Sequence, residues 1–258
     1  MNPVQVLEWI GRRSLVYLQE SGQGTILFTR VIRSIFKGPF PVRLTTQQME
    51  EIGFRSLPVV LITAIFTGAV LALQTYSGFK RFGAEGLVGT VVALSMTREL
   101  GPVLASIMVA GRVGSAMAAE LGTMRVTEQI DALITLATDP VHYLVVPRFV
   151  ASLVMLPFLV IFADIIGIIG GYVVAVTILG ASSTSYINRT LQYLEFSDIT
   201  IGLLKAAVFG MIIALVGCHM GFYTTGGAEG VGKATTRAVV GASILILISN
   251  YFLTALLF

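Results

Sequence analysis

The chain has 258 residues, of which 55% are hydrophobic and 12% are charged, and its mean hydropathy is +0.86. Soluble domains carry about 25% charged residues, and a soluble core of this composition would expose too much apolar surface. The composition therefore excludes an ordinary soluble protein. It predicts an all-α integral membrane protein, because a helix satisfies its own backbone polar groups in lipid.

The first 50 residues predict helices on the membrane surface. Apolar residues recur at mixed helical spacing over residues 6–18 and again over residues 26–36. Neither stretch is long enough to span, so we expect two interfacial helices with their apolar faces toward the lipid tails. Residues 38–41 (GPFP) separate them from the membrane domain, residues 51–258.

Five later segments are long and apolar enough to cross a membrane, which takes about 20 residues each. We expect spans at about Ile52–Phe79, Leu87–Leu121, Phe149–Leu179, Ile201–Tyr223 and Ala238–Phe258. The second segment would be about 52 Å long as a straight helix, against a hydrocarbon core of about 30 Å. Its end must therefore project from the membrane, be broken, or both.

The basic residues predict the orientation of the spans. Seven of the 17 Lys and Arg residues lie in residues 1–56, and 12 of the 17 fall on the inner side if the N-terminus is cytoplasmic. This bias predicts a cytoplasmic N-terminus and a C-terminus on the far side. The basic residues are scattered among acidic ones, so a nucleic-acid surface is not expected.

Two connections predict short amphipathic helices. The inner connection contains "TEQIDALITLATDP", which predicts a helix over about residues 126–137 with Thr127 as its N-cap and Asp139-Pro140 as its stop. Such a helix could dock a cytoplasmic partner or only pack against its own bundle, and the pattern leaves both open. The far-side loop, residues 180–200, predicts a second amphipathic helix.

The stretch "GAEGVGKAT" (227–235) imitates a phosphate-binding loop, but Ala234 stands where Ser or Thr would hold magnesium. We expect a flexible glycine-rich turn there, and any ATP must bind to another chain. No residues have the sequence spacing that is typical of metal ligands, and no group of residues has the pattern of a catalytic site. Cys218 is alone in an apolar run and is expected to be a small buried hydrophobe.

Four ionisable residues lie at membrane depth: Arg98, Glu99, Asp164 and Lys205, with Asn250 as a neutral polar addition. Each costs about 3 kcal/mol or more at the bilayer centre unless it is satisfied. Arg98 and Glu99 are adjacent, so on a helix they point about 100° apart and need separate partners. Lys205 is the expected partner of Glu99. The group is either a functional site or a structural cluster that pairs its own charges.

Three long motifs carry a family resemblance: "LSMTRELGPVLASIMVAGRVGSAMAAELGTMRVTEQIDAL", "DPVHYLVVPRF" and "GKATTRAVVGAS". They resemble the MlaE/YrbE family, the permease subunit of the Mla phospholipid ABC transporter. The similarity runs from about Leu57 to the C-terminus, and the first 50 residues match only in character.

The resemblance implies a homodimer in the bacterial inner membrane, with a cytoplasmic N-terminus and a periplasmic C-terminus. It implies ABC ATPase subunits (MlaF-like) that bind ATP and magnesium, a periplasmic ring of MCE-domain proteins (MlaD-like) and a STAS-domain protein (MlaB-like) on the ATPase. The implied function is the movement of phospholipids between the inner and outer membranes, which maintains outer-membrane lipid asymmetry.

The resemblance also implies three groups of site residues. A lipid cavity between two permeases would be lined here by Leu71, Gln74, Phe79 and Phe82, above a polar cluster of Arg98, Glu99 and Lys205. The coupling helix that docks on the ATPase would use Glu128, Gln129, Asp131 and Leu133. The family has an aspartate where this chain has Asn250, so either the cluster is more positive here or Asp164 compensates.

Two other functions stay open beside the ATP-driven lipid permease. A proton-coupled secondary transporter could work through Glu99 and Lys205, but it would predict internal repeats, which five spans do not show. A membrane scaffold would only anchor the MCE and ATPase proteins.

Overall fold

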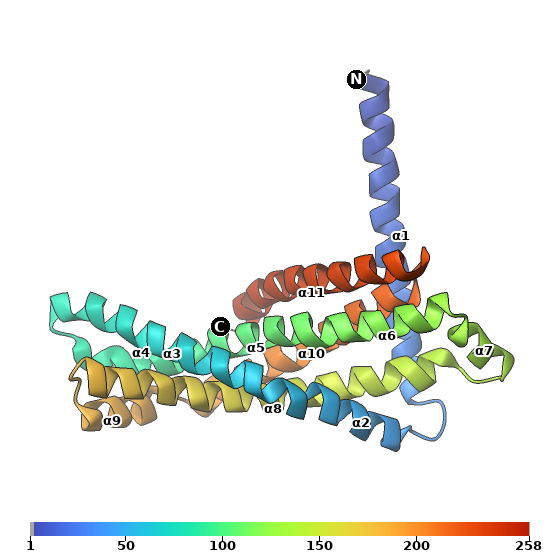
Figure 1. Ribbon diagram of the computed structural model, residues 1–258. Helices are drawn as coiled ribbons and strands as arrows, with labels where there is room; N and C mark the ends of the chain where they lie inside the picture. The colour runs from blue at the N-terminus through green and yellow to red at the C-terminus, as the bar shows by residue number, and fades with distance from the viewer. Residues whose placement is uncertain (1–2, 258) are drawn as a thin grey trace.

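The computed structural model of the protein describes residues 3–257, without the side chains of residues 3–10, 12–14, 16–17 and 21. The described residues form helices joined by short turns and contain no β-strand (Figure 1). The predicted all-α membrane fold is therefore confirmed. The apolar pattern predicted for residues 6–18 falls mostly on side chains outside this description, as does Phe258 at the end of the predicted fifth span.

Two helices precede the first span. α1 (Pro3–Ile35) is one continuous helix, and α2 (Val42–Ile52) begins after the turn at residues 38–41. The predicted break at this turn is confirmed, because its two prolines cannot donate helical hydrogen bonds. The predicted separation of residues 6–18 from residues 26–36 is wrong, since no proline lies between them and glycine weakens a helix without removing a donor.

α1 runs across the direction of the spans, and its N-terminal part stands clear of the bundle (Figure 1). Its last turns are attached to the bundle. Leu27 and Val31 are buried, and Nδ1 of His142 lies 3.1 Å from the carbonyl oxygen of Ser34. This arrangement is the one expected of a helix that lies along a membrane surface.

Within the described residues, five helical segments are long and apolar enough to cross a membrane: Val42–Phe82, Glu85–Val126, Val141–Ile178, Phe196–Phe222 and Gly227–Leu257. Four of their main helices are α3 (Leu57–Phe79), α8 (Val146–Val173), α10 (Phe196–Phe222) and α11 (Gly227–Leu257). The five predicted spans are confirmed. Four of them extend further than predicted at the end of the bundle that carries the connection between the second and third spans, because hydropathy marks only the apolar part of a helix.

The second span is a continuous helical rod built from α4 (Val88–Ser95), α5 (Gly101–Val109) and α6 (Ser115–Val126). Two π-helical turns, Met96–Leu100 and Ala110–Gly114, join these pieces. Each π turn inserts a residue and widens the helix locally without ending it. The long second span is therefore modified by π turns rather than broken.

The connection between the second and third spans forms α7 (Gln129–Thr135), which is shorter than the predicted residues 126–137. The prediction that Thr127 caps this helix is wrong. Thr127 ends α6 instead, and its hydroxyl donates to the carbonyl oxygen of Thr123 at 2.8 Å. Glu128 has a left-handed backbone with φ of 60°, and this residue turns the chain into α7.

The connection over residues 180–200 forms α9 (Ser183–Tyr193), at the opposite end of the bundle from α7 (Figure 1). The helix predicted in this connection is confirmed. Tyr186 anchors it: its hydroxyl donates to the carbonyl oxygen of Ile168 at 3.2 Å, and its ring meets Tyr172 edge-on with centroids 5.4 Å apart. Burial raises the pKa of the Tyr186 hydroxyl, so the group stays protonated and keeps this hydrogen bond.

The glycine-rich stretch at residues 227–235 is the start of α11, so the prediction of a flexible turn is wrong. The turn comes just before it. Gly226 and Gly227 have φ of +90° and +63°, which glycine adopts without strain. Glu229 then pairs with Lys233 one helical turn later at 2.6 Å, a spacing that stabilises a helix.

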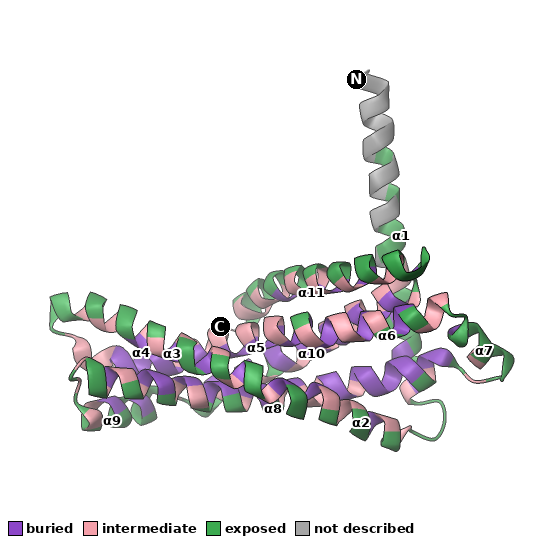
Figure 2. Ribbon diagram, in the orientation of Figure 1, coloured by how far each residue is buried: buried purple, intermediate pink, exposed green. Residues whose placement is uncertain are grey.

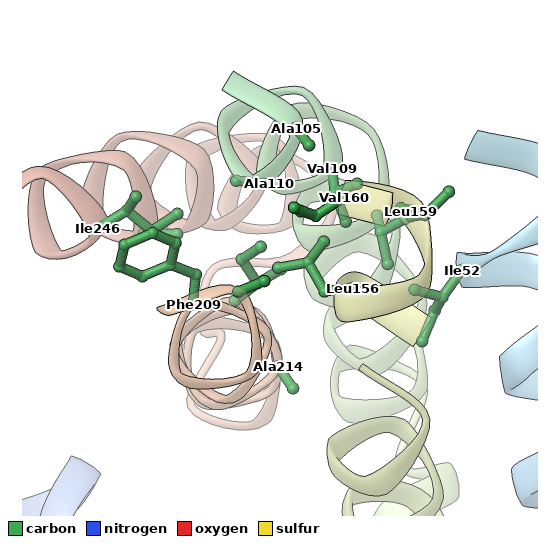
Figure 3. Packing of buried hydrophobic residues seen from close by; sticks show 14 of the residues in the cluster. Ile52, Ala105, Val109, Ala110, Leu156, Leu159, Val160, Phe209, Ala214 and Ile246 are labelled. Carbon is green, nitrogen blue, oxygen red and sulfur yellow. The ribbon is translucent and has the colours of Figure 1, made fainter. Parts of the chain in front are cut away.

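The core lies along α8 and α10, whose inward faces are buried (Figure 2). Figure 3 shows Leu159 of α8 within this cluster, and Ile246 of α11 beside Phe209 of α10. Glycine permits the closest helix crossing, because a Cβ on Gly68 of α3 would collide with the backbone of Gly167 in α8. The outward faces of α3 and α11 remain apolar and exposed (Figure 2), as expected for surfaces that meet lipid or another membrane subunit.

Candidate functional site

Three spans meet at a polar cluster, which we define as Glu99, Lys205, Asn250 and Thr254. Glu99 lies in the first π turn of the second span, Lys205 lies on α10, and the other two lie on α11. Nζ of Lys205 donates to Oε1 of Glu99 at 2.7 Å and to the Thr254 hydroxyl at 2.8 Å. Nδ2 of Asn250 donates to Oε2 of Glu99 at 2.7 Å. The predicted pairing of Glu99 with Lys205 is confirmed.

Pro102 explains a third hydrogen bond of Lys205. A proline has no N–H to donate to the carbonyl four residues earlier, which here belongs to Arg98. That carbonyl oxygen accepts from Nζ of Lys205 at 3.0 Å. The described residues therefore offer this ammonium group an acceptor for each of its three hydrogens, which allows the Lys205 side chain to be completely buried. The π turn directly before Pro102 is thus part of the site.

Arg98 points away from Glu99 and has its own partner. Its guanidinium contacts Oδ1 of Asp198 through two nitrogens, at 2.6 and 2.8 Å. The other oxygen of Asp198 accepts from the backbone N–H of Glu195 at 3.2 Å, within a capping box at the start of α10. The prediction that the adjacent charges have separate partners is confirmed.

Asp198 is a negative charge near the cluster that the expectation for Asn250 did not include, and the four charges form two ion pairs, Arg98 with Asp198 and Lys205 with Glu99. The alternative that Asp164 compensates is wrong, because Asp164 lies on α8 against Gly101 and its Oδ1 has no hydrogen-bond partner among residues 3–257. An amide at position 250 also suits the site, because it donates to Glu99 where a carboxylate could only accept.

An open apolar groove of about 600 Å³ runs along α3, and we call it the α3 groove. It is lined by Ile62, Thr63, Phe66, Thr67, Val70, Leu71, Gln74 and Leu100. Two of the residues predicted to line a lipid cavity, Leu71 and Gln74, line this groove. Leu100, which follows Glu99 in the chain, joins the groove to the second span.

Two residues predicted for the cavity lie outside this groove. Phe79 is at the end of α3 and packs partly against the core. Phe82 lies in the 3₁₀ turn beyond α3 and is 83% exposed. The prediction carried them over by position from the family resemblance, and in the structure α3 ends at Phe79.

At the opposite end of the bundle from α9, α7 presents the residues predicted to couple to an ATPase. Glu128, Gln129 and Asp131 are exposed, while Ile130 is completely buried. Leu133 is half-buried and packs against the core. α7 is therefore fixed to its own bundle on one side and offers a partly acidic surface on the other.

Comparison with known proteins assigns the family. A family model described as Permease MlaE matches residues 45–256, which is most of the chain. The chain belongs to the MlaE permease family. The predicted resemblance is therefore confirmed, and the match leaves out most of the N-terminal segment that resembles the family only in character.

Relatives of this MlaE-family chain cover nearly all of it. The probable ABC transporter permease protein of Rickettsia felis is 54% identical over 249 residues, 96% of each chain. Arabidopsis thaliana TRIGALACTOSYLDIACYLGLYCEROL 1, chloroplastic, is 41% identical over 233 residues, 90% of this chain and 67% of the relative. The intermembrane phospholipid transport system permease protein MlaE of Haemophilus influenzae is 36% identical over 258 residues, which are 99% of this chain and 98% of the relative. The protein is a multi-pass membrane permease of the ABC type, which implies an ATPase partner.

The sequence does not predict two of the residues that the structure places at the MlaE-family site. Thr254 lies four positions after Asn250, so the two share one face of α11, and that spacing was a readable signal. Asp198 was assigned to a loop because the fourth span was expected to begin at Ile201. The capping-box spacing of Glu195 and Asp198 could have moved that boundary earlier.

Proposed function

We propose that this MlaE-family chain is the transmembrane permease subunit of an ATP-driven transporter that moves phospholipids between the inner and outer membranes and so maintains outer-membrane lipid asymmetry. One observation carries the proposal. The α3 groove has apolar walls that include Leu100, and the preceding residue in the chain, Glu99, has its carboxylate paired with the buried Lys205. A phospholipid has the same two-part chemistry, and the name of the H. influenzae relative describes phospholipid transport.

The α3 groove is open on its outer side, so two copies of the chain would enclose a shared cavity between them. Acyl chains would lie against Leu71 and the other groove residues. The charged headgroup would meet the cluster at Glu99, whose side chain is 36% exposed, while Lys205 stays buried and holds the carboxylate in place.

The N-terminus would be cytoplasmic and the C-terminus periplasmic in the bacterial inner membrane. α7 would then dock on the ABC ATPase, which binds ATP and magnesium, through Glu128, Gln129 and Asp131. The chain itself would be a non-catalytic subunit without a cofactor. A STAS-domain protein would bind the ATPase, and a ring of MCE-domain proteins would receive the lipid at the α9 end.

The proposal is tested by measuring the rates of lipid transfer and ATP hydrolysis of the purified complex that carries Glu99→Gln or Glu128→Ala. Glu99→Gln should slow lipid transfer by about tenfold, because a neutral amide replaces the carboxylate at the end of the groove. Glu128→Ala should weaken the coupling of ATP hydrolysis to transfer. The matched control is Glu50→Gln, an exposed residue of α2 that forms no ion pair among the described residues.

Each rival function predicts a different outcome. A proton-coupled transporter would move lipid in response to a pH gradient without ATP. A scaffold would lose nothing with either variant as long as the complex assembled. The proposal is wrong if both variants assemble and retain ATPase activity and lipid transfer at the level of Glu50→Gln.

A further inference from the structure

A second cavity lies at the α9 end of the bundle, between α9 and the start of the second span. Its volume is about 290 Å³, and it shares no residue with the α3 groove. Polar side chains line much of it, among them Tyr76, Glu85, Ser182 and Ser185, with Tyr186 as an aromatic wall. We call it the headgroup cavity.

Two opposite charges flank the headgroup cavity without pairing. Glu85 lines it and is half-buried. The guanidinium of Arg189, on α9, lies beside the wall at Gly86: a Cβ on this glycine would be 3.4 Å from Cζ of Arg189 and 3.2 Å from the hydroxyl of Ser185. Among the described residues, neither Glu85 nor Arg189 takes part in an ion pair. The cavity thus offers one site for a cation and one for an anion.

A separate apolar groove shares Tyr186 as a lining residue with the headgroup cavity. Its volume is also about 290 Å³, and it lies between the end of the third span and α9. The side chains of Ile169, Ile187 and Leu191 line it and are between 44% and 72% exposed. A surface of this kind at the end of a span would contact acyl chains in a bilayer.

We propose that these two cavities bind one zwitterionic phospholipid with a primary ammonium headgroup, as a resident lipid distinct from the transported one. The ammonium meets Glu85, with the rings of Tyr76 and Tyr186 alongside. The phosphate meets Arg189 and the Ser185 hydroxyl. One acyl chain occupies the groove at Ile187, so the lipid fastens α9 to the second and third spans. The inference does not depend on the proposed transport function.

The charges also predict selectivity. A phospholipid whose headgroup is anionic and lacks an ammonium would satisfy Arg189 but leave Glu85 unpaired beside a second negative charge. The site should therefore prefer phosphatidylethanolamine over phosphatidylglycerol of the same acyl composition.

Native mass spectrometry of the delipidated full-length chain, titrated with these two lipids, tests the proposal. The unmodified chain should retain phosphatidylethanolamine about fivefold better than phosphatidylglycerol, which corresponds to one partly exposed ion pair. Glu85→Gln should abolish that preference, and Glu85→Asp should restore part of it. Arg189→Gln should weaken the binding of both lipids. The control is Glu229→Gln, the same change at the other end of the bundle, which should behave like the unmodified chain.

A further variant separates this site from the α3 groove. Leu71→Trp fills the α3 groove and should leave the preference for phosphatidylethanolamine intact, even where it stops transport. Equal binding of the two lipids by the unmodified chain would overturn the proposal. So would a preference that survives Glu85→Gln or that disappears with Leu71→Trp. Thermal unfolding of every variant checks that a lost preference is not a lost fold.

Discussion

Lys205 is completely buried in a span, and its surroundings explain how a charge can persist there. Glu99, the Thr254 hydroxyl and the Arg98 carbonyl oxygen each accept one of its hydrogens. The Arg98 carbonyl lies four residues before Pro102, which cannot bond to it. One cation thus satisfies a carboxylate and a carbonyl that would otherwise be costly in a dry interior.

Removing only the cation should therefore be strongly destabilising. Lys205→Met leaves the Glu99 carboxylate without its counter-ion, and we expect a loss of about 3 kcal/mol in the free energy of unfolding. The double variant Glu99→Leu/Lys205→Met should be more stable than Lys205→Met alone, because no uncompensated charge remains. Chemical unfolding in detergent measures both. If the losses in the free energy of unfolding for the changes at Glu99 and Lys205 simply add in the double variant, the two residues are not coupled.

At this scale the sequence predicted one partner and missed others. The 100° separation of adjacent helical positions was enough to give Arg98 and Glu99 different partners. Asp198 and Thr254 were not predicted, because their roles depend on where α10 begins and on which face of α11 turns inward. The inward face of α11 is set by tertiary packing, which hydropathy does not report.

At the scale of elements, the closest contact is the crossing of α3 and α8. Gly68 of α3 lies directly against the backbone of Gly167 in α8, so the helices meet without side chains between them. The sequence predicted both spans but not this crossing, because a glycine in a span carries no partner information by itself. The glycine-rich start of α11 was mispredicted for a related reason: composition suggested a turn, whereas packing and an i,i+4 ion pair maintain a helix.

Gly68→Ala should force α3 and α8 apart. The added methyl group would have to displace backbone atoms rather than a flexible side chain. We therefore expect a loss of about 1–3 kcal/mol in the free energy of unfolding. Gly78→Ala is the matched control on the same helix, because a Cβ there has nothing within 4 Å, and it should be neutral or slightly stabilising. Thermal unfolding of the two variants in one detergent makes the comparison. Equal melting temperatures would contradict the assigned crossing.

At the scale of the whole molecule, the two ends of the bundle have different chemistry. The α7 end offers exposed acidic residues on a helix anchored by Ile130, which suits a docking partner. The α9 end carries the headgroup cavity. Between them the α3 groove is open, and the described residues of one chain do not close it. Number and order of spans could be predicted from the sequence, but the open groove could not, because it depends on how α3 lies against the second span.

The central claim is that the α3 groove holds the transported lipid. Its most direct test is cryo-electron microscopy of the assembled complex, with its ATPase, in a phospholipid bilayer disc. We expect elongated lipid density against Leu71 and Gln74 that reaches Leu100, the residue after Glu99. An α3 groove filled by side chains of a neighbouring subunit, without lipid density, in a complex that still transfers lipid would contradict it.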